Sequence, residues 1–168
     1  WARVGKGHDL DAQGLSYRSG DAYRASARGK SNQPAVFLDS AGRAFATDAH
    51  SLPSARSQGE PMTGRFNLTT GANFEHVVMA EDSQVLLMAS DAGYGFITDF
   101  KDLVSKNKNG KALVSVPKGG ILLKPIRVSD VASDYCMAIS NEGRVLLFPL
   151  RDLPKLGKGK GNKIISIP

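Results

Sequence analysis

Lysines recur in two short loops of the chain, and lysine ammonium groups bind phosphate oxygens. The loops carry Lys106, Lys108 and Lys111, and then Lys155, Lys158, Lys160 and Lys163. The segment 101–124 holds six lysines against a single acid, and the segment 151–163 holds five basic residues against a single acid. Clustered lysines of this kind are typical of contact with the phosphate backbone of a nucleic acid, without readout of its sequence.

These loops occupy the same place in an internal repeat. Three stretches, 35–62, 85–117 and 135–168, each have an apolar run, a turn that ends in glycine and a second apolar run. The turn glycines Gly42, Gly93 and Gly143 are separated by 51 and 50 positions. A leucine (Leu52, Leu103, Leu153) and a loop glycine (Gly59, Gly110, Gly161) keep nearly the same period. Three anchors with one period indicate an array of units of about 50 residues.

Each unit has room for about four short strands. The two apolar runs around a turn glycine predict a β-hairpin with that glycine at positive φ. The runs are apolar at consecutive positions, as in strands covered on both faces, and no amphipathic helical period of useful length occurs. The sequence therefore predicts an all-β, propeller-like array of four-stranded blades, either partial or open.

We expect a single domain over residues 1–168. Residues 1–34 form an incomplete first blade, followed by repeats at 35–84, 85–134 and 135–168. The segment Trp1–Val4 resembles the second strand of a hairpin, but nothing upstream of it supplies the first strand. We therefore expect the chain to be a piece of a longer protein, with exposed strand edges at both ends unless the ends meet.

Composition narrows the class of protein. The chain has 168 residues, 41% of them hydrophobic, with 18 glycines and a formal net charge of +6. The single cysteine, Cys136, lies in an apolar run and is expected in the core; it and the lack of a signal peptide indicate a reducing, cytoplasmic setting. No apolar stretch is long enough to span a membrane.

Equivalent loops lie side by side around the rim of a propeller, so the repeated charges predict a curved basic band that would bend a duplex. The residues predicted to contact phosphate are Lys6, Arg18, Arg24, Arg28, Lys30, Arg56, Arg65, Lys106, Lys108, Lys111, Lys155, Lys158, Lys160 and Lys163. The alternative for each loop is a solvated face. The segment 75–99, with five acids and no Lys or Arg, is either a solvated edge or a contact with another part of a larger protein.

Several stretches, in order, resemble the C-terminal domains of bacterial DNA topoisomerase IV A subunits, in the family shared with gyrase A. They are Gly5–Asp9, Gly14–Asp21, Gly29–Pro34, Leu86–Phe96 and Lys158–Ile165. The resemblance implies a β-pinwheel, whose blades exchange a hairpin strand with their neighbours, and which binds and bends the DNA segment delivered to the enzyme. The parent enzyme of this family is an ATP-dependent type II topoisomerase of two A and two B subunits, which decatenates daughter chromosomes and relaxes supercoils.

The same resemblance implies the partners and cofactors. The expected partners are double-stranded DNA of any sequence, the ATPase B subunit, and the remainder of the A subunit, with the isolated chain a monomer. No cofactor is expected in this chain, since ATP and Mg²⁺ belong to other domains or subunits. The expected location is the cytoplasm, on the bacterial chromosome, with peripheral association with the inner membrane left open.

Two alternative functions remain. In gyrase A a Gln-Arg-Arg-Gly-Gly-Lys-Gly box wraps DNA, and its place here, Ser16–Asp21, keeps one arginine and one glycine. That departure disfavours a gyrase-type wrapping domain. A protein-interaction propeller that does not bind DNA is the alternative from another class.

Catalytic chemistry is not expected of this chain. No tyrosine lies in the motif of the family's active-site tyrosine. The run Gly29-Lys30-Ser31 resembles the end of a phosphate-binding loop, but Arg24 stands where such a loop requires its first glycine. The three histidines are too scattered to predict a metal site.

Overall fold

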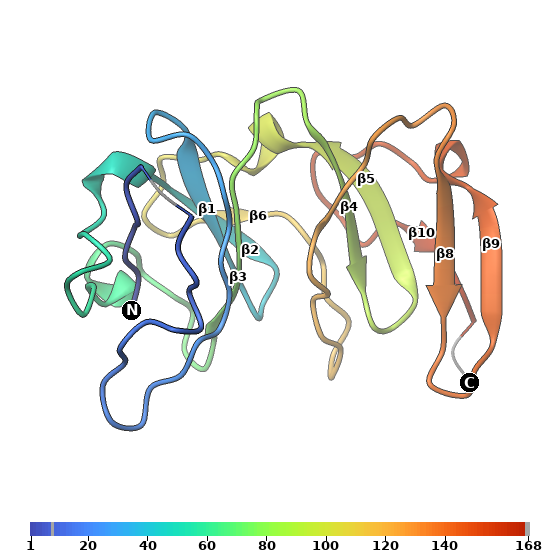
Figure 1. Cartoon of the computed structure of the whole chain (residues 1–168). Coiled ribbons are helices and arrows are strands. Elements are labelled where there is room, and N and C mark those ends of the chain that lie inside the picture. The colour runs from blue at the N-terminus through green and yellow to red at the C-terminus, as the bar shows by residue number, and fades with distance from the viewer. Residues whose placement is uncertain (8, 167–168) are drawn as a thin grey trace.

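The computed structural model describes residues 1–7 and 9–166 and consists of strands, short 3₁₀ turns and loops (Figure 1). From here on the blades are numbered from β1 onward, so that the N-terminal segment 1–34 is not counted. The first blade is then a four-stranded sheet in the order β3 (Phe74–Val78), β1 (Pro34–Asp39), β2 (Arg43–Asp48) and β6 (Lys111–Ala112). The second blade is ordered β7 (Ile126–Arg127), β4 (Val85–Ser90), β5 (Tyr94–Asp99) and β10 (Asn162–Lys163). The third is the hairpin of β8 (Tyr135–Ile139) and β9 (Val145–Pro149). The expected all-β array of four-stranded, propeller-like blades is confirmed.

Each of the first two blades takes its last strand from the following repeat. β6 follows β5 in the sequence but pairs antiparallel with β2, with Ala44 opposite Lys111. β10 pairs in the same way with β5, with Gly95 opposite Asn162. The first blade therefore combines three strands from 35–84 with one strand from 85–134, and a sheet is not the same unit as a sequence repeat.

The turn glycines have the backbone conformation expected of them. Gly42, Gly93 and Gly143 have φ of 84°, 81° and 78°. A residue with a β-carbon adopts such angles only at a cost, which explains why glycine recurs at this point of each hairpin.

The leucine anchors end short 3₁₀ turns that follow each hairpin. These turns are Ala49–Ser51, Phe100–Leu103 and Leu150–Asp152, and a fourth lies at Met62–Gly64. The side chains of Leu52, Leu103 and Leu153 are buried. A 3₁₀ turn lets each leucine enter the core between blades just before the chain leaves toward its neighbour.

The cores lie between consecutive blades. Val36 and Leu38 of β1 are fully buried in one cluster with Leu86 and Met88 of β4. The opposite face of β4 packs on the third blade, where Cys136 is buried as expected. Within the described residues, no helix has the length and apolarity needed to cross a membrane.

The first residues of the chain occupy the place of a second hairpin strand. Ala2 pairs antiparallel with Glu60, as Ala44 pairs with Lys111, and Val4 pairs in parallel with Ser54. At the other end of the array (Figure 1), the outward face of the third blade exposes apolar side chains, among them Met137 and Leu147. Among the described residues, β9 has a strand partner only in β8.

Candidate nucleic-acid interface

The third basic loop pairs with the segment that directly follows the second one. We call the segments 53–61, 104–112 and 154–163 the exchange loops, because each leads into the position of an exchanged strand. Gly159 of the third loop pairs in parallel with Val114, just after β6: its N–H donates to the carbonyl of Leu113 at 2.8 Å, and its carbonyl accepts from Ser115 at 2.9 Å. Lys158 and Lys160 flank this residue, and the Lys158 side chain is exposed. The third loop therefore lies against the chain that continues from the second loop through β6.

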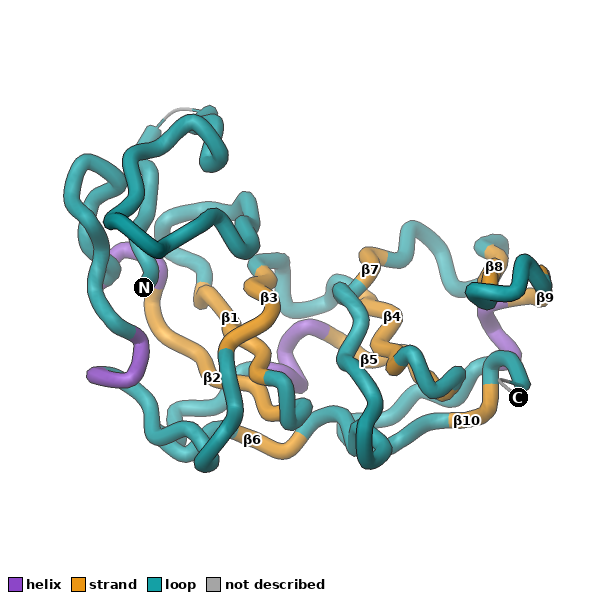
Figure 2. The backbone as a smooth tube through the Cα atoms, turned by 90° about the horizontal axis from the view of Figure 1, so that it is seen from below, coloured by secondary structure: helices purple, strands orange, loops and turns teal. Residues whose placement is uncertain are grey.

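This surface follows one edge of the array. In Figure 2, β6 and β10 lie along the same side of the molecule, while β3 and β7 lie toward the opposite side. We call the first side the exchange edge and the second the β3–β7 edge. Because Lys111 and Lys163 belong to β6 and β10 themselves, the sheet order places them on the exchange edge.

The second exchange loop is held firmly by the first blade. Arg43 donates from Nε to the carbonyl of Asn109 and from a terminal nitrogen to the carbonyl of Gly110, both at 2.9 Å. The N–H of Asn67 donates to the carbonyl of Lys108 at 2.9 Å. The backbone from Lys108 to Gly110 is therefore held in place, while the side chains of Lys106 and Lys108 are exposed. Fixed positions reduce the entropy lost when the ammonium groups bind an anion.

The third exchange loop is held by the second blade. The N–H of Leu156 donates to the carbonyl of Ile97 at 2.9 Å, and the N–H of Ile97 donates to the carbonyl of Pro154 at 3.0 Å. The ammonium of Lys160 stands 3.6 Å above the ring centre of Tyr94, in a cation–π contact. Lys163, opposite Tyr94 in the β5–β10 pair, is exposed.

Three other predicted residues of the loops and their surroundings are engaged in contacts within the protein. Lys155 forms an ion pair with Asp99 at 2.9 Å, and Lys111 donates to the carbonyl of Asp102. Arg65 pairs with Glu60 and donates to the hydroxyls of Thr47 at 2.9 Å and Ser51 at 2.7 Å, so it ties the first exchange loop to its hairpin. Because these three cations already bind groups of the protein, we expect each to bind an external phosphate more weakly than an unengaged cation would. Arg56, on the first loop, is exposed.

The predicted cations of the N-terminal segment lie elsewhere. Arg24 pairs with Glu75 of β3, and Lys30 pairs with Glu81 at 2.7 Å, so both are bound to acids of the β3–β7 edge. The carboxylate of Glu81 raises the pKa of the Lys30 ammonium, and Lys30 lowers the pKa of the Glu81 carboxyl. The structure thus separates Arg24 and Lys30 from the loops.

The other three N-terminal cations are exposed. Arg28 pairs with Asp9 at 3.3 Å, the Arg18 guanidinium lies 4.1 Å from the ring centre of Trp1, and the side chain of Lys6 is open to solvent.

The acids of 75–99 are largely engaged within the chain. In addition to Glu75 and Glu81, Asp99 pairs with Lys155, and Asp91 accepts from the N–H of Ile121 at 2.6 Å. Glu81, Asp82 and Asp91 are also exposed, as the solvated-edge alternative requires.

Two residues that position the loops were missed by sequence reasoning. Arg43 and Tyr94 each stand directly after a turn glycine, and each contacts the exchange loop of the next repeat. The signal was present, since Arg144 follows Gly143 in the third repeat. In the first two repeats, a long basic or aromatic side chain after the turn glycine contacts the next exchange loop, whereas Arg144 in the third repeat pairs with Glu142.

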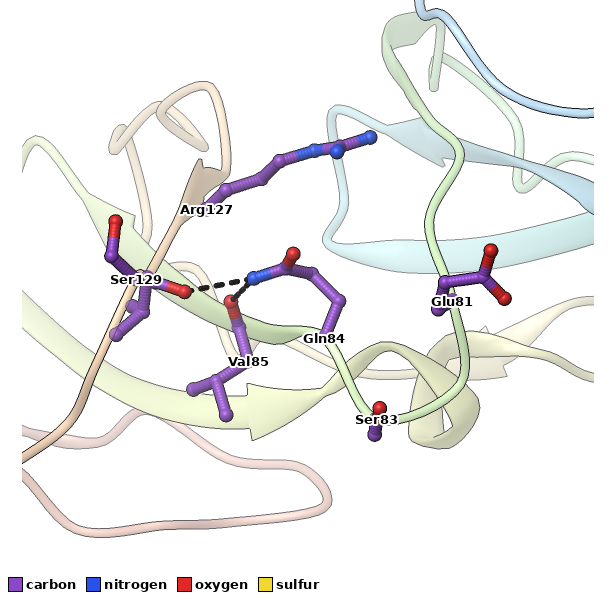
Figure 3. Close-up of a pocket in the computed structure, with 7 residues that line it drawn as sticks. Glu81, Ser83, Gln84, Val85, Arg127 and Ser129 are labelled. Carbon is purple, nitrogen blue, oxygen red and sulfur yellow. Dashed lines mark hydrogen bonds between the residues drawn. The ribbon is translucent and has the colours of Figure 1, made fainter.

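Two cavities lie away from β6 and β10. A hollow of about 490 Å³ at the β3–β7 edge is lined by residues including Glu81, Gln84 and Arg127 (Figure 3). The amide of Gln84 donates to the carbonyls of Val85 and Val128, both at 2.9 Å. A cavity of about 1010 Å³ lies between the N-terminal segment and the first blade. In the part of the chain that the structure describes, no group of three or more His, Cys, Asp or Glu side chains could hold a metal ion.

Comparison with known proteins gives consistent matches. A family model described as DNA gyrase C-terminal domain, beta-propeller, matches residues 84–129 and 134–168. The whole chain is 55% identical to the A subunit of DNA topoisomerase 4 from Escherichia coli (strain K12) and 58% identical to that from Haemophilus influenzae, and it spans 22% of the length of each.

Solved structures agree with these matches. The E. coli ParC C-terminal domain matches 100% of this chain, which covers 68% of that domain, with 55% identity and a TM-score of 0.92. A DNA gyrase A C-terminal domain has a TM-score of 0.67 at 18% identity, over 92% of this chain and 53% of that one, and shares the fold.

Proposed function

This chain belongs to the family of C-terminal domains of bacterial topoisomerase IV A subunits, and from that membership we propose that it is a non-catalytic domain that binds and bends double-stranded DNA. It contacts the phosphate backbone without reading sequence, and it positions the duplex that the enzyme transports. The strand breakage and ATP hydrolysis of the type II topoisomerase take place in other parts of the enzyme, which decatenates chromosomes and relaxes supercoils.

The observation that supports this proposal is the pairing of Gly159 with Val114. It brings the third lysine-bearing loop against the segment that directly follows the second one, on the exchange edge. A duplex that lies along this edge meets Lys106 and Lys108 and then Lys158 and Lys160, on backbones that are already fixed. Because the surface continues from blade to blade, the duplex must follow the direction in which the blades are stacked.

The partners follow from the same proposal. The chain acts together with the remainder of its A subunit, with an ATPase B subunit, in an assembly of two of each, and is a monomer when isolated. It needs neither ATP nor Mg²⁺, which other domains or subunits hold. It works on the bacterial chromosome in the cytoplasm.

The first experiment is a binding titration of this chain with random-sequence duplexes, short and long, across a series of salt concentrations. Contact with roughly 4 to 8 phosphates predicts a steep fall of log K with log salt, and a longer duplex binds more tightly because it reaches both loops. Binding that does not change with salt, or no binding to DNA, contradicts the proposal and favours a protein-interaction propeller. Tight wrapping of a duplex much longer than the exchange edge favours the gyrase-type alternative.

A further inference from the structure

The N-terminal segment meets the first blade through residues one repeat apart. Arg24 pairs with Glu75, and Lys30 pairs with Glu81; both pairs are separated by 51 positions, which is the spacing of the turn glycines Gly42 and Gly93. Each ion pair therefore joins equivalent places in consecutive units of the array. A pairing of this kind occurs twice, six residues apart, with the cation on the earlier unit each time.

Packing supports the equivalence of the two segments. Ala27 packs against the cluster that contains Ala35 and Phe37 of β1. Val78, 51 positions later, lies in the cluster with Leu86 and Met88 of β4. The segment around Ala27 therefore packs against the first blade in the same way as β3 packs against the second blade. Contact there is close, since a β-carbon on Gly29 would lie 2.7 Å from Met79.

Polar contacts also cross the next joint on the same edge. His76 of β3 donates from Nε2 to the carbonyl of Leu122 at 3.0 Å, and Arg127 of β7 donates to the carbonyl of Met79. Figure 3 shows the Arg127 side chain extending from β7 toward the segment that carries Glu81. Blades are therefore joined on the exchange edge by backbone pairing and on the β3–β7 edge by side chains.

We propose that Arg24–Glu75 and Lys30–Glu81 form an inter-blade clamp that sets the spacing between the N-terminal segment and the first blade along the β3–β7 edge. The angle between stacked units depends on their spacing along the two edges, and strand exchange already fixes the spacing on the exchange edge. The clamp therefore helps to set the curvature of the array. Given the proposed function, it also helps to set the bend of the duplex on the opposite edge. Arg24 and Lys30 are positioning residues in this account, and they do not contact phosphate.

Charge reversal and charge swapping distinguish these roles. The reversal variant carries Arg24→Glu and Lys30→Glu, so that carboxylates face carboxylates. The swap variant adds Glu75→Arg and Glu81→Lys, which restores both pairs with opposite polarity and returns the net charge to its original value. A control variant, Lys118→Glu with Lys124→Glu, makes the same change in net charge as the reversal. A second control exchanges the charges of Glu142 and Arg144, a pair inside one hairpin turn.

The DNA-independent measurement is the distance between spin labels at Ala25→Cys and Ser83→Cys, in a Cys136→Ala background. The clamp predicts a longer and broader distance distribution in the reversal variant, recovery in the swap variant, and no change in either control. Unchanged distances in the reversal variant overturn the clamp. This measurement tests the clamp even if the chain proves not to bind DNA.

The DNA measurement is the bend of a duplex labelled at both ends, together with its affinity at fixed salt. We expect the reversal variant to change the bend and the swap variant to restore both the bend and the original affinity. If Arg24 and Lys30 contact phosphate instead, the swap variant binds more weakly than the original chain, because glutamates then face the duplex, and its salt slope falls by about 2. That result overturns the positioning role.

Discussion

Gly110 lies against the ring of Phe45 so closely that a β-carbon on residue 110 would stand 2.7 Å from the ring atom Cε1. Gly110 has φ of 69° and closes the second exchange loop, just before β6 pairs with β2. Gly161 stands in the same relation to the second blade, where its β-carbon would come within 2.0 Å of the carbonyl oxygen of Gly95. The loop glycines are therefore required by the close approach of the exchanged strand to the preceding hairpin.

We predict that Gly110→Ala destabilises the array by roughly 2 kcal/mol or more, from backbone strain and overpacking against Phe45. The matched control is Gly119→Ala. Gly119 has φ of 78°, but a β-carbon there would have no atom within 4 Å, so the substitution adds strain without a clash. Urea unfolding of both variants measures the difference. Equal losses in the two variants would show that the contact with Phe45 contributes nothing.

The repeat period allowed much of this fold to be predicted. Gly42 and Gly93 mark the hairpins, and Leu52 and Leu103 mark the turns into the core, because turn geometry and burial restrict the residue types at those points. The partner of an exchanged strand could not be predicted in the same way. Lys111 could pair within its own repeat or with a neighbour, since β6 has only two residues and no distinctive pattern.

The repeat period also allowed part of the candidate site to be predicted. Charge repetition located Lys108 and Lys158 on equivalent loops. Arg24 was predicted to contact phosphate, but it pairs with Glu75 of the next unit. The order of charges along the chain does not show which acid lies opposite Arg24 in the folded array. Its partner Glu75 is recognisable once the 51-residue period is applied to both segments.

Burial of Asp39 predicts a dependence of stability on pH. This side chain is fully buried, and burial raises the pKa of its carboxyl. Its Oδ1 accepts from the N–H groups of Ala41 and Arg43, while Oδ2 has no partner among the described residues. The folded state binds this proton more tightly than the unfolded state, so the stability contributed by the group is present at low pH and is lost as pH rises through the folded pKa.

We therefore expect Asp39→Ser to raise the free energy of unfolding at pH 7 by about 1 kcal/mol, since it removes a buried carboxylate that is only partly satisfied. Serine suits this place: Ser140 stands there in the third repeat, and its hydroxyl accepts from the N–H of Arg144 at 3.1 Å. Denaturation at pH 7 and near pH 4 checks the sign, because the advantage should shrink at the lower pH. An advantage that grows on acidification would refute this account of Asp39.

The exposed loop lysines predict a defined change in salt dependence. Lys108→Glu and Lys158→Glu should each weaken DNA binding to a similar degree for every sequence and lower the salt slope by about 1. The single-site control is Lys124→Glu, which changes the net charge equally but lies beside β7 at the other edge of the second blade. If the control weakens binding as much as the loop variants, net charge and not the exchange edge determines affinity.

Arg43 provides a test of whether fixed loops matter as well as charged ones. Arg43 donates hydrogen bonds to the carbonyls of Asn109 and Gly110 and lies outside the predicted set of phosphate contacts. Arg43→Gln should therefore loosen the second exchange loop without removing the charges of Lys106 and Lys108. Affinity should fall several-fold, because ordering a loose loop on binding costs about 1 kcal/mol per immobilised side chain. Arg144→Gln is the matched control, since Arg144 follows the turn glycine of the third repeat and pairs only with Glu142 among the described acids.

The salt slope separates the two explanations of a weakened Arg43→Gln variant. If Arg43 only holds the loop, the number of phosphates contacted stays the same, and the slope of log K against log salt is unchanged while the whole line shifts to weaker binding. Hydrogen exchange at Lys108 to Gly110 should quicken in the same variant, because two of the contacts that protect the loop are gone. A slope lower by about 1, with exchange unaltered, would instead identify Arg43 as a phosphate contact. In that event the basic surface would extend from the exchange loops onto the hairpin turns of the blades.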